Sequence, residues 1–381
     1  MEIVFLSNFY NHHQMPLSRS LQKILHGNYA FIATTPMDAE RRQMGYQEYT
    51  ESFLYQFEDC PEECMEQINR ADAVIFGSAP RKLIQERLKA GKPVFQYSER
   101  IFKKKPPFYE IPARTIKYYL EKGRYSNMYL LCASAFTAAD YATTHTFPQR
   151  AYKWGYFPET KHYQMDALYA QKDKQKILWV GRFLDWKHPD DVLRVAKRLK
   201  EDGYRFSMDI AGTGEMEAQL KSMAEVMGLN DCVTFLGPIP SNRVRELMEK
   251  AGIYLFTSDR YEGWGAVLNE SMNSGCAVVA SHAIGSVPFL LKDGENGFIY
   301  RNGDINDLYQ KIKYLLDNPG EQERLGKVAY ETIVGEWNAE VAAERLINLS
   351  EHLLAGEKYP DLYRTGPCSR AEIIKDDWFY E

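Results

Sequence analysis

The chain has 381 residues, of which 45% are hydrophobic and 26% are charged, and its formal net charge is −5. This length exceeds what one hydrophobic core usually supports and favours two or more domains. The composition is that of a globular protein, and the negative balance argues against binding of polyanions over the whole surface. No run of about 18 apolar residues occurs, and the N-terminus lacks the pattern of a signal peptide, so we expect no membrane span.

Six cysteines are scattered along the chain, and only Cys60 and Cys64 lie close together in sequence. The absence of a regular cysteine spacing in a chain of this size predicts free thiols in a reducing compartment, which is the cytoplasm. A zinc site would need a second pair of ligands at matching spacing. Because none accompanies this pair, we interpret the two thiols as residues at the start of a helix.

Short apolar segments alternate with helical patterns in the first half of the chain. Near-continuously apolar strands of this kind are typical of parallel sheets that helices cover on both faces. Pro16 suits the first turn of a helix, and Leu17, Leu21 and Ile24 would lie on one face of that helix. The expected strands are residues 3–9, 29–34, 73–78, 93–98, 128–134 and 150–156.

The same alternation returns in the second half, after a polar stretch without periodicity. Gly228 and Gly275 occupy positions where helices are expected to end. Two further helices are expected near residues 304–317 and 336–355. The expected strands are residues 177–181, 206–212, 232–237, 253–258, 276–281 and 297–300.

This alternation of strand and helix predicts an α/β protein with two Rossmann-like, doubly wound domains. The first domain would span residues 1–160, the linker residues 161–174 and the second domain residues 175–356. The tail, residues 357–381, contains five aromatic residues, too many for a typical disordered segment. We therefore expect the tail to pack on the first domain.

Two glutamates follow the fourth expected strand of the second half. Glu262 would lie on the loop at the carboxyl end of this strand, where ligands bind in open α/β sheets. Glu270 would lie about two turns into a helix that begins near Trp264 or Gly265. Gly263 and Gly265 would let the backbone approach a ligand closely, and the helix N-terminus would offer N–H groups to a diphosphate. Glutamate–glycine loops without any function are also common before helices.

Two cations follow the first expected strand of the second half. Arg182 and Lys187 would both project into the loop at its carboxyl end, where they would bind a diphosphate and neutralise a departing nucleotide. A solvated basic loop is the alternative interpretation. Gly212 and Gly214, and the loop at residues 235–239, are weaker signals for contact with a phosphate, a sugar or a nucleobase.

Together these motifs resemble the C-terminal domain of the GT4 family of retaining glycosyltransferases, which have the GT-B fold. The resemblance lies in VGR…K at 180–187, AGTGE at 211–215, FLG at 235–237 and two glutamates separated by seven residues. It implies two Rossmann-like domains that face a central cleft. It also implies transfer of a sugar from a nucleotide-diphosphate sugar, UDP- or GDP-linked, to a glycan or lipid-linked acceptor in cell-surface polysaccharide synthesis.

The resemblance assigns roles to individual residues. Arg182 and Lys187 would hold the donor diphosphate, and Glu262 would contact the donor sugar and stabilise an oxocarbenium-like transition state. Glu270 would accept hydrogen bonds from the ribose hydroxyls. The other donor-binding positions would offer backbone groups or line the base, and they are Gly181, Gly212, Gly214, Leu236, Gly237, Ile239, Gly263, Trp264, Gly265, Ala266 and Val267.

The first domain resembles the family more loosely, because SNFYNHHQMP stands where many relatives have a glycine-rich loop after the first strand. His12 and His13 would lie at the carboxyl end of this strand and contact the acceptor hydroxyl or the diphosphate, or else lie on the surface. Glu99 and Arg100 follow another strand and would either meet the acceptor or form a structural ion pair. No DxD motif follows a strand, so we expect no metal ion and no other cofactor.

Residues 100–124 contain eight basic and two acidic residues, with aromatic residues between them. Basic and aromatic residues together are typical of segments that dock on anionic membranes, and such docking would suit an enzyme that elongates lipid-linked glycans. A solvated basic face with core aromatics explains the same pattern. No nucleic-acid-binding module is recognisable, so we expect no nucleic-acid partner.

Two other functions fit part of the pattern. A GT-B-like sugar-nucleotide epimerase or phosphorylase would need acid–base residues beside C2 of the sugar, a pyridoxal lysine or a phosphate site, and none of these is evident. A non-catalytic sugar-nucleotide-binding partner of another transferase typically lacks the catalytic acid, whereas both Glu262 and Glu270 are present. Sugar transfer is therefore the favoured function.

Overall fold

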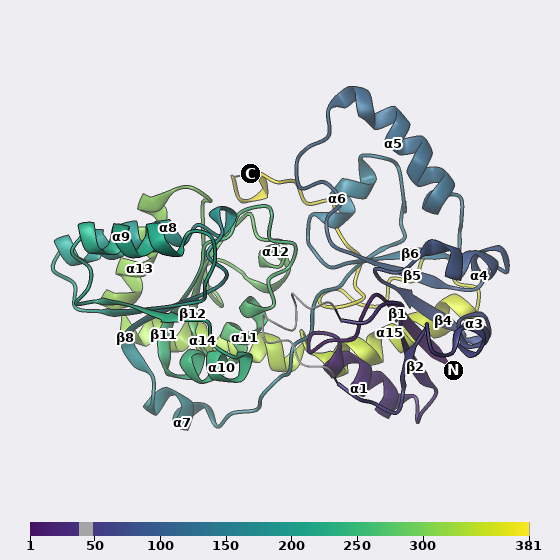
Figure 1. The fold of residues 1–381 in the computed structure, drawn as a ribbon, viewed down its shortest axis with the longest axis horizontal. Helices are drawn as coiled ribbons and strands as arrows, with labels where there is room; N and C mark the ends of the chain where they lie inside the picture. The colour runs from purple at the N-terminus through teal and green to yellow at the C-terminus, as the bar shows by residue number, and fades with distance from the viewer. Residues whose placement is uncertain (38–48, 381) are drawn as a thin grey trace. The chain divides into compact units, whose positions relative to one another are not determined.

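The computed structural model describes residues 1–37 and 49–380 and divides the chain into two compact units. Unit 1 comprises Met1–Glu159 and Glu336–Lys375, and unit 2 comprises Thr160–Gly335 and Asp376–Glu381. Each unit is built on one sheet of parallel strands with helices packed against it (Figure 1). This is the expected α/β architecture with two Rossmann-like sheets.

The sheet of unit 1 has the strand order β3-β2-β1-β4-β5-β6-β7. The order reverses between β1 and β4, as in Rossmann-type sheets, and every strand pair is parallel. Six of these strands were predicted, and β3, which is three residues long and only partly buried, was missed. The strands are β1 (Ile3–Ser7), β2 (Tyr29–Ala33), β3 (Leu54–Gln56), β4 (Ala73–Phe76), β5 (Val94–Ser98), β6 (Met128–Cys132) and β7 (Ala151–Lys153).

Helices α3 (Pro61–Arg70), α4 (Gln85–Lys89) and α6 (Thr137–Ala142) pack on one face of this sheet and share a buried apolar core with it. Helix α1 (Met15–Ile24) has Pro16 in its first turn, as predicted, and packs against α15 (Ala339–Leu354). The remaining helical elements in the described residues of unit 1 are η1 (Arg81–Ile84), η2 (Phe108–Glu110), α5 (Ile111–Tyr118) and η3 (Tyr119–Gly123).

The sheet of unit 2 has the strand order β10-β9-β8-β11-β12-β13, which reverses between β8 and β11. Again every strand pair is parallel. All six strands were predicted from short apolar runs between helical patterns, but β8 begins at Asp173, within the predicted linker, because its polar first half pairs with the sheet without an apolar signal. They are β8 (Asp173–Val180), β9 (Ser207–Ala211), β10 (Val233–Gly237), β11 (Ala251–Phe256), β12 (Ala277–Ser281) and β13 (Phe298–Tyr300).

One face of this second sheet forms a continuous apolar core with α8 (Pro189–Glu201), α9 (Glu217–Val226) and α13 (Ile305–Asp317). These three helices lie together along the same side of the sheet (Figure 1). The other helical elements of unit 2 are α7 (Met165–Ala170), η4 (Asp185–Lys187), α10 (Ser241–Lys250), α11 (Val267–Asn273), α12 (Val287–Leu290), α14 (Pro319–Gly335) and η5 (Trp378–Tyr380).

The helix that carries Glu270 begins at Val267, and not at Trp264 or Gly265 as predicted. Gly265 has a φ of +81°, which a right-handed helix excludes, so the helix starts after it. Glu270 therefore lies one turn into the helix rather than two. Gly228 and Gly275, with φ of +67° and +65°, do follow helix ends, as predicted.

The segment from Glu336 to Lys375 groups with unit 1, although residues up to 356 were assigned to the second domain from the sequence. Helix α15 packs on α1, and the chain after it pairs with the edge strand β7, where Lys153 N donates to Ser369 O at 2.8 Å. Residues 376–380 belong to unit 2, where Trp378 Nε1 donates to His282 O at 3.1 Å. Residue 381 of the predicted tail lies outside the described residues.

All six cysteines are free thiols, as predicted. Cys60 precedes the first residue of α3 and Cys64 lies within its first turns, with the two sulfur atoms 3.6 Å apart. Within residues 1–37 and 49–380, none of the helices combines the length and the apolar character that crossing a bilayer would require.

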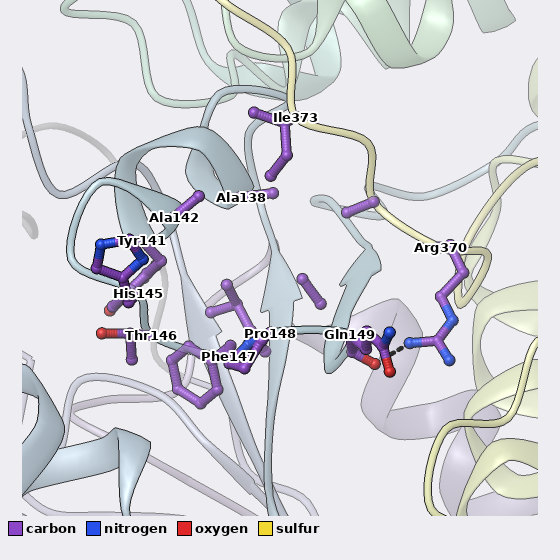
Figure 2. Close-up of a pocket in the computed structure, with 13 residues that line it drawn as sticks. Ala138, Tyr141, Ala142, His145, Thr146, Phe147, Pro148, Gln149, Arg370 and Ile373 are labelled. Carbon is purple, nitrogen blue, oxygen red and sulfur yellow. Dashed lines mark hydrogen bonds between the residues drawn. The ribbon is translucent and has the colours of Figure 1, made fainter.

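Unit 1 contains a cavity of about 370 Å³ beside β6 and β7 (Figure 2). The loop before β7 lines one side of it, and His145, Phe147 and Gln149 of this loop have φ of +52°, +59° and +58°, which are uncommon for residues other than glycine. Arg370 donates to the carbonyl oxygen of Gln149. No residue that the sequence predicted for a functional site lines this cavity.

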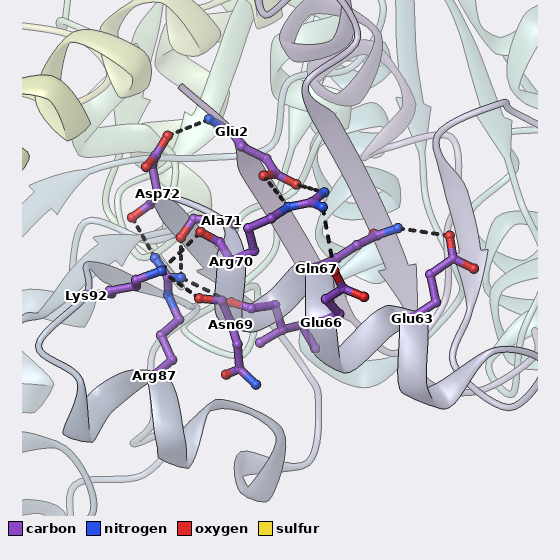
Figure 3. A network of polar contacts seen from close by, with 11 residues as sticks. Glu2, Glu63, Glu66, Gln67, Asn69, Arg70, Ala71, Asp72, Arg87 and Lys92 are labelled. Atoms are coloured by element: carbon purple, nitrogen blue, oxygen red, sulfur yellow. Dashed lines mark hydrogen bonds and ion pairs between the residues drawn. The ribbon is translucent and has the colours of Figure 1, made fainter.

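A buried arginine holds the loops on one side of unit 1 together (Figure 3). Arg87 is 1% exposed. Its guanidinium donates to the carbonyl oxygens of Ile68, Ala71, Asp72 and Pro93. These carbonyls close the turns between α3 and β4 and before β5, so a single side chain satisfies buried acceptors from both turns.

Replacing Arg87 with methionine should lower the free energy of unfolding by roughly 2–5 kcal/mol, because several buried carbonyl oxygens lose their donors. Urea denaturation followed by circular dichroism measures the change. Arg70→Met is the matched control, since Arg70 is mostly exposed and pairs with Glu2 at the surface. We expect little effect from this control, and similar effects of the two variants would contradict the role of Arg87.

Candidate functional site

In unit 2 the strand order reverses between β8 and β11. Two residues that were predicted to be catalytic lie on the loops that follow these two strands. Lys187 ends η4, which follows β8, and Glu262 lies on the loop after β11. Lys187 Nζ lies 2.5 Å from Glu262 Oε2, and the two side chains are 14% and 12% exposed. The structure therefore brings these two residues together at the edge where Rossmann-like sheets bind ligands.

Hydrogen bonds tie the loops after β8 and β11 to each other. Thr257 Oγ1 donates to Lys187 O at 2.6 Å and accepts from Trp179 Nε1 at 2.9 Å. Asp259 N donates to the carbonyl oxygen of Trp186 at 2.9 Å. Backbone and core groups thus fix the two loops that present Lys187 and Glu262, so the ion pair does not have to hold them by itself.

Glu262 is held by its side chain and by its backbone. Ser258 Oγ donates to Glu262 Oε2 at 3.0 Å, so this hydroxyl and Lys187 use the same carboxylate oxygen. Gly285 N donates to Glu262 O at 3.3 Å, which ties the residue to the loop after β12. Among the residues that the structure describes, no group donates to Oε1, and this second oxygen can accept from a ligand.

Glu270 lies on α11, and burial raises the pKa of its carboxyl group to about 7, while Arg245 acts in the opposite direction. Arg245 is itself buried, and it supports α11 from α10. Its Nη1 donates to Glu270 O at 3.2 Å and its Nη2 to Asn273 Oδ1 at 2.5 Å. This arginine was not predicted as part of the site.

Tyr254 lies close to both glutamates. Burial raises the pKa of its phenol well above the usual value, and the negative charges of Glu270 and Glu262 raise it further. Its hydroxyl donates to the carbonyl oxygen of Val180, at the end of β8, at 3.4 Å. Glu262 and Glu270 therefore act on one buried hydroxyl at the carboxyl edge of the sheet.

Arg182 follows β8 directly, and its side chain is exposed. Within residues 1–37 and 49–380 it forms no ion pair, so the structure does not join it to Lys187 and Glu262. Arg182 shares only the loop with Lys187. In the same described ranges, no group of three or more His, Cys, Asp or Glu side chains is placed to hold a metal ion.

Contacts within the protein explain why residues 212 and 214, in the loop after β9, are glycines. Gly212 and Gly214 have φ of +141° and +158°. A Cβ atom on Gly212 would lie 1.8 Å from Gly181 O, and one on Gly214 would lie 2.6 Å from Phe183 O. The loop after β9 therefore packs directly on the backbone of the loop after β8. The residue type at these two positions is explained without a ligand.

Gly265 is explained in a similar way, since a Cβ atom on it would lie 2.3 Å from Phe256 Cζ. Trp264 is fully buried, and its Nε1 donates to Asn269 Oδ1 at 2.9 Å, so its side chain belongs to the core. The other predicted donor-binding residues lie on or beside the loops after β8, β10 and β11, and they are Gly181, Leu236, Gly237, Ile239, Gly263, Ala266 and Val267.

Three of the predicted acceptor residues gather at the carboxyl edge of the sheet in unit 1. The rings of His12 and His13 lie 3.9 Å apart, and the ring of His13 stacks on Tyr156 at 5.7 Å. The hydroxyl of Tyr156 donates to Glu99 Oε1 at 2.6 Å. Burial lowers the pKa of His12, so this imidazole stays neutral to lower pH than usual. Tyr156, which joins the histidines to Glu99, was not predicted.

Arg100 does not belong to this cluster. Its side chain is 3% exposed, and its Nη2 lies 3.1 Å from Asp140 Oδ1. The second carboxylate oxygen of Asp140 accepts from Phe102 N at 2.9 Å. The structure therefore supports the alternative interpretation of Arg100, a structural ion pair, with Asp140 as the partner.

The family model described as "Glycosyl transferases group 1" matches residues 162–332. An uncharacterized glycosyltransferase of Haemophilus influenzae is 30% identical over 176 residues, which are 44% of this chain and 49% of that protein. The amylovoran biosynthesis glycosyltransferase AmsK of Erwinia amylovora is 28% identical over 200 residues, which are 51% of this chain and 49% of that protein. The chain thus spans about half the length of the curated relatives it matches.

The solved structure of Anabaena HepE in complex with UDP is similar in fold along most of the chain. Its TM-score is 0.69 at 15% sequence identity, and the match covers 92% of this chain and 100% of that chain. At this identity the likeness shows the fold alone. The similarity to HepE confirms the predicted fold class, GT-B with two Rossmann-like domains.

Gly212→Ala should lower the free energy of unfolding by at least about 1–3 kcal/mol, because the new Cβ collides with the backbone of Gly181 and the φ is unfavourable. Urea denaturation checks this. Gly320→Ala, at an open position in α14, is the control and should be neutral or stabilising. A tolerated alanine at residue 212 would contradict the packing of the two loops.

The raised pKa of Glu270 predicts a pH-dependent stability. The carboxyl binds its proton more tightly in the folded chain, so its stabilising contribution is complete below about pH 4.5 and is lost as the pH rises to about 7. Glu270→Gln removes this loss. The gain in melting temperature of the variant over the wild type should therefore grow across this window and then level off. A gain that is independent of pH would contradict the assignment.

Proposed function

We propose that the chain, whose residues 162–332 match the family model of glycosyl transferases group 1, transfers a sugar from a nucleotide-diphosphate sugar to a hydroxyl group, with retention of the anomeric configuration. The proposed acceptor is a glycan or a lipid-linked glycan of a cell-surface polysaccharide, and the relative AmsK is described as a glycosyltransferase of amylovoran biosynthesis. The ion pair of Lys187 with Glu262, at the carboxyl ends of β8 and β11, carries the proposal.

In this proposal Lys187 and Glu262 act on opposite charges of one transition state. The nucleotide diphosphate leaves the anomeric carbon with its bonding electrons, and the ammonium group of Lys187 offsets the growing negative charge. A lysine has three N–H donors, so Lys187 keeps donors for phosphate oxygens while one contacts Glu262. The carboxylate of Glu262 stabilises the positive charge that develops on the sugar ring.

Further residues of unit 2 would bind the diphosphate, the ribose and the base of the donor. Arg182, exposed on the loop after β8, would join Lys187 at the diphosphate, and Glu270 would accept hydrogen bonds from the ribose hydroxyls. Backbone groups of residues 236–239 would line the base, and those of residues 263–267 would contact the sugar and phosphates. We propose a UDP- or GDP-linked donor and favour UDP, because HepE was solved with UDP.

On the acceptor side we propose the cluster of His12, His13 and Glu99 in unit 1. A neutral imidazole can accept the proton of the attacking hydroxyl, and the lowered pKa of His12 favours that form. The acceptor would attack from the face that the nucleotide leaves, which gives retention. No metal ion is needed in this scheme, since cationic side chains offset the diphosphate charge. The free cysteines fit a reaction in the reducing cytoplasm.

A thermal-shift screen with UDP, GDP and ADP and their sugars tests the donor, since the nucleotide that binds the folded chain raises its melting temperature by mass action. Transfer is then followed as nucleotide release. Release that requires an acceptor supports transfer, and release without an acceptor indicates hydrolysis of the donor. A changed sugar on an intact nucleotide sugar favours an epimerase, and binding without any turnover favours a non-catalytic partner. The configuration of the product, read by NMR, tests retention.

Glu262→Gln and Lys187→Met should each lower kcat about 10²–10³-fold, because each removes one stabilised charge of the transition state. The glutamine variant should still bind nucleotide in the thermal-shift assay. The double variant should lose less than the product of the two single losses, because the residues act on one transition state.

Lys200→Met is the control for these variants, since Lys200 pairs with Asp231 on the surface of unit 2. It should leave kcat unchanged. Full activity of Glu262→Gln would show that Glu262 has no part in the chemistry.

A further inference from the structure

Residues 108–120 of unit 1 expose an apolar surface. Five large side chains, which we call the apolar ridge, have exposed fractions from 49% to 84%, and they are Phe108, Tyr109, Ile116, Tyr119 and Leu120. No residue of η2, α5 or η3 is buried. Figure 1 shows α5 at the periphery of unit 1, with the strands of the sheet on one side of it only.

The helical spacing gathers these side chains on one face. The ridge positions, together with the exposed Pro112 and Ala113, recur every three or four residues, which is the repeat of a single helix face. A helix on the surface of a globular protein normally turns such a face inward. Here the arrangement is reversed, because the apolar face is the exposed one.

The opposite face holds the segment to the rest of unit 1 through polar and aromatic groups. The guanidinium of Arg114 lies 5.3 Å from the ring centre of Phe102, and Arg114 also pairs with Glu110 at 2.6 Å. Lys122 Nζ donates to the hydroxyl of Tyr141 at 2.7 Å. The orientation of the segment is therefore fixed by contacts that leave the ridge uncovered.

Exposed cations border the ridge. Lys104 and Lys105 precede η2, Lys117 lies on α5, and Arg124 follows η3. A second copy of this surface would bring its own cations against these four, which disfavours self-association through the ridge. An anionic bilayer matches both features, since apolar side chains enter the acyl boundary and cations meet the head groups.

We propose that the apolar ridge inserts into an anionic membrane surface, with Lys104, Lys105, Lys117 and Arg124 at the level of the lipid head groups. Tyrosines such as Tyr109 and Tyr119 suit this level because the ring is apolar and the hydroxyl is polar. If the proposed function is right, this docking brings unit 1 to the membrane that holds a lipid-linked acceptor. Membrane binding itself does not depend on the sugar-transfer chemistry.

Flotation of the purified full chain with lipid vesicles tests the proposal. The probes are vesicles of phosphatidylcholine alone and of phosphatidylcholine with about 30% phosphatidylglycerol. The chain should float with the anionic vesicles and not with the neutral ones. Raising the salt from about 0.1 M to about 1 M should reduce binding, because the screening length falls from about 10 Å to about 3 Å. Absence of binding to the anionic vesicles would overturn the proposal.

Two variants separate the apolar contribution to membrane binding from the electrostatic contribution. Phe108→Ser/Ile116→Ser/Leu120→Ser and Lys104→Gln/Lys105→Gln/Lys117→Gln should each weaken binding to anionic vesicles by about tenfold or more. The control, Val226→Ser/Tyr314→Ser/Leu354→Ser, changes exposed apolar residues elsewhere and should bind as the wild type does. Wild-type binding by the ridge variant would overturn the proposal.

Further measurements test whether the ridge serves self-association instead, and whether membrane binding is independent of the proposed function. Size-exclusion chromatography should show the same apparent mass for the wild type and the ridge variant, and a loss of oligomers in the variant would assign the ridge to self-association instead. Melting temperature, nucleotide binding and transfer to a water-soluble acceptor should be unchanged in the ridge variant. Loss of membrane binding with these intact would separate docking from the proposed function.

Discussion

The parallel pairing of β8 with β11 is the constraint on which the site in unit 2 depends. Parallel neighbours end at the same edge of the sheet, so the loops that follow them meet although Lys187 and Glu262 are 75 residues apart. Thr257 and Trp179 then lock the loops together through the core. The ion pair is therefore a consequence of strand order, and it lies where that order reverses.

The fold could be predicted from the sequence to a large extent because each buried strand is a short apolar run. The exceptions were β3, whose partly exposed LYQ has no such signal, and the polar first half of β8, which was not predicted as strand. The start of α11 was placed too early, because a single glycine decides it through a positive φ that composition does not reveal. The packing of α15 on unit 1 was also not predictable, since an apolar helix face does not specify which sheet or helix it covers.

The site was predictable where residues follow strands directly and not where tertiary contacts decide. Lys187 and Glu262 could be paired in advance from the rule for strand ends. Arg245, Tyr254 and Tyr156 could not, because they lie within helices, strands or loops without a motif and reach the site only through packing. The same limit applies to Arg100, whose partner, Asp140, lies 40 residues away.

The path of the chain through the two units has a consequence for biosynthesis. Unit 2 is nearly continuous, from Thr160 to Gly335, whereas unit 1 needs Glu336–Lys375 for the helix on α1 and the segment that pairs with β7. A ribosome therefore releases all strands of unit 2 before it releases the last element of unit 1. Unit 1 therefore stays without its covering helix α15 while all the strands of unit 2 are being synthesised.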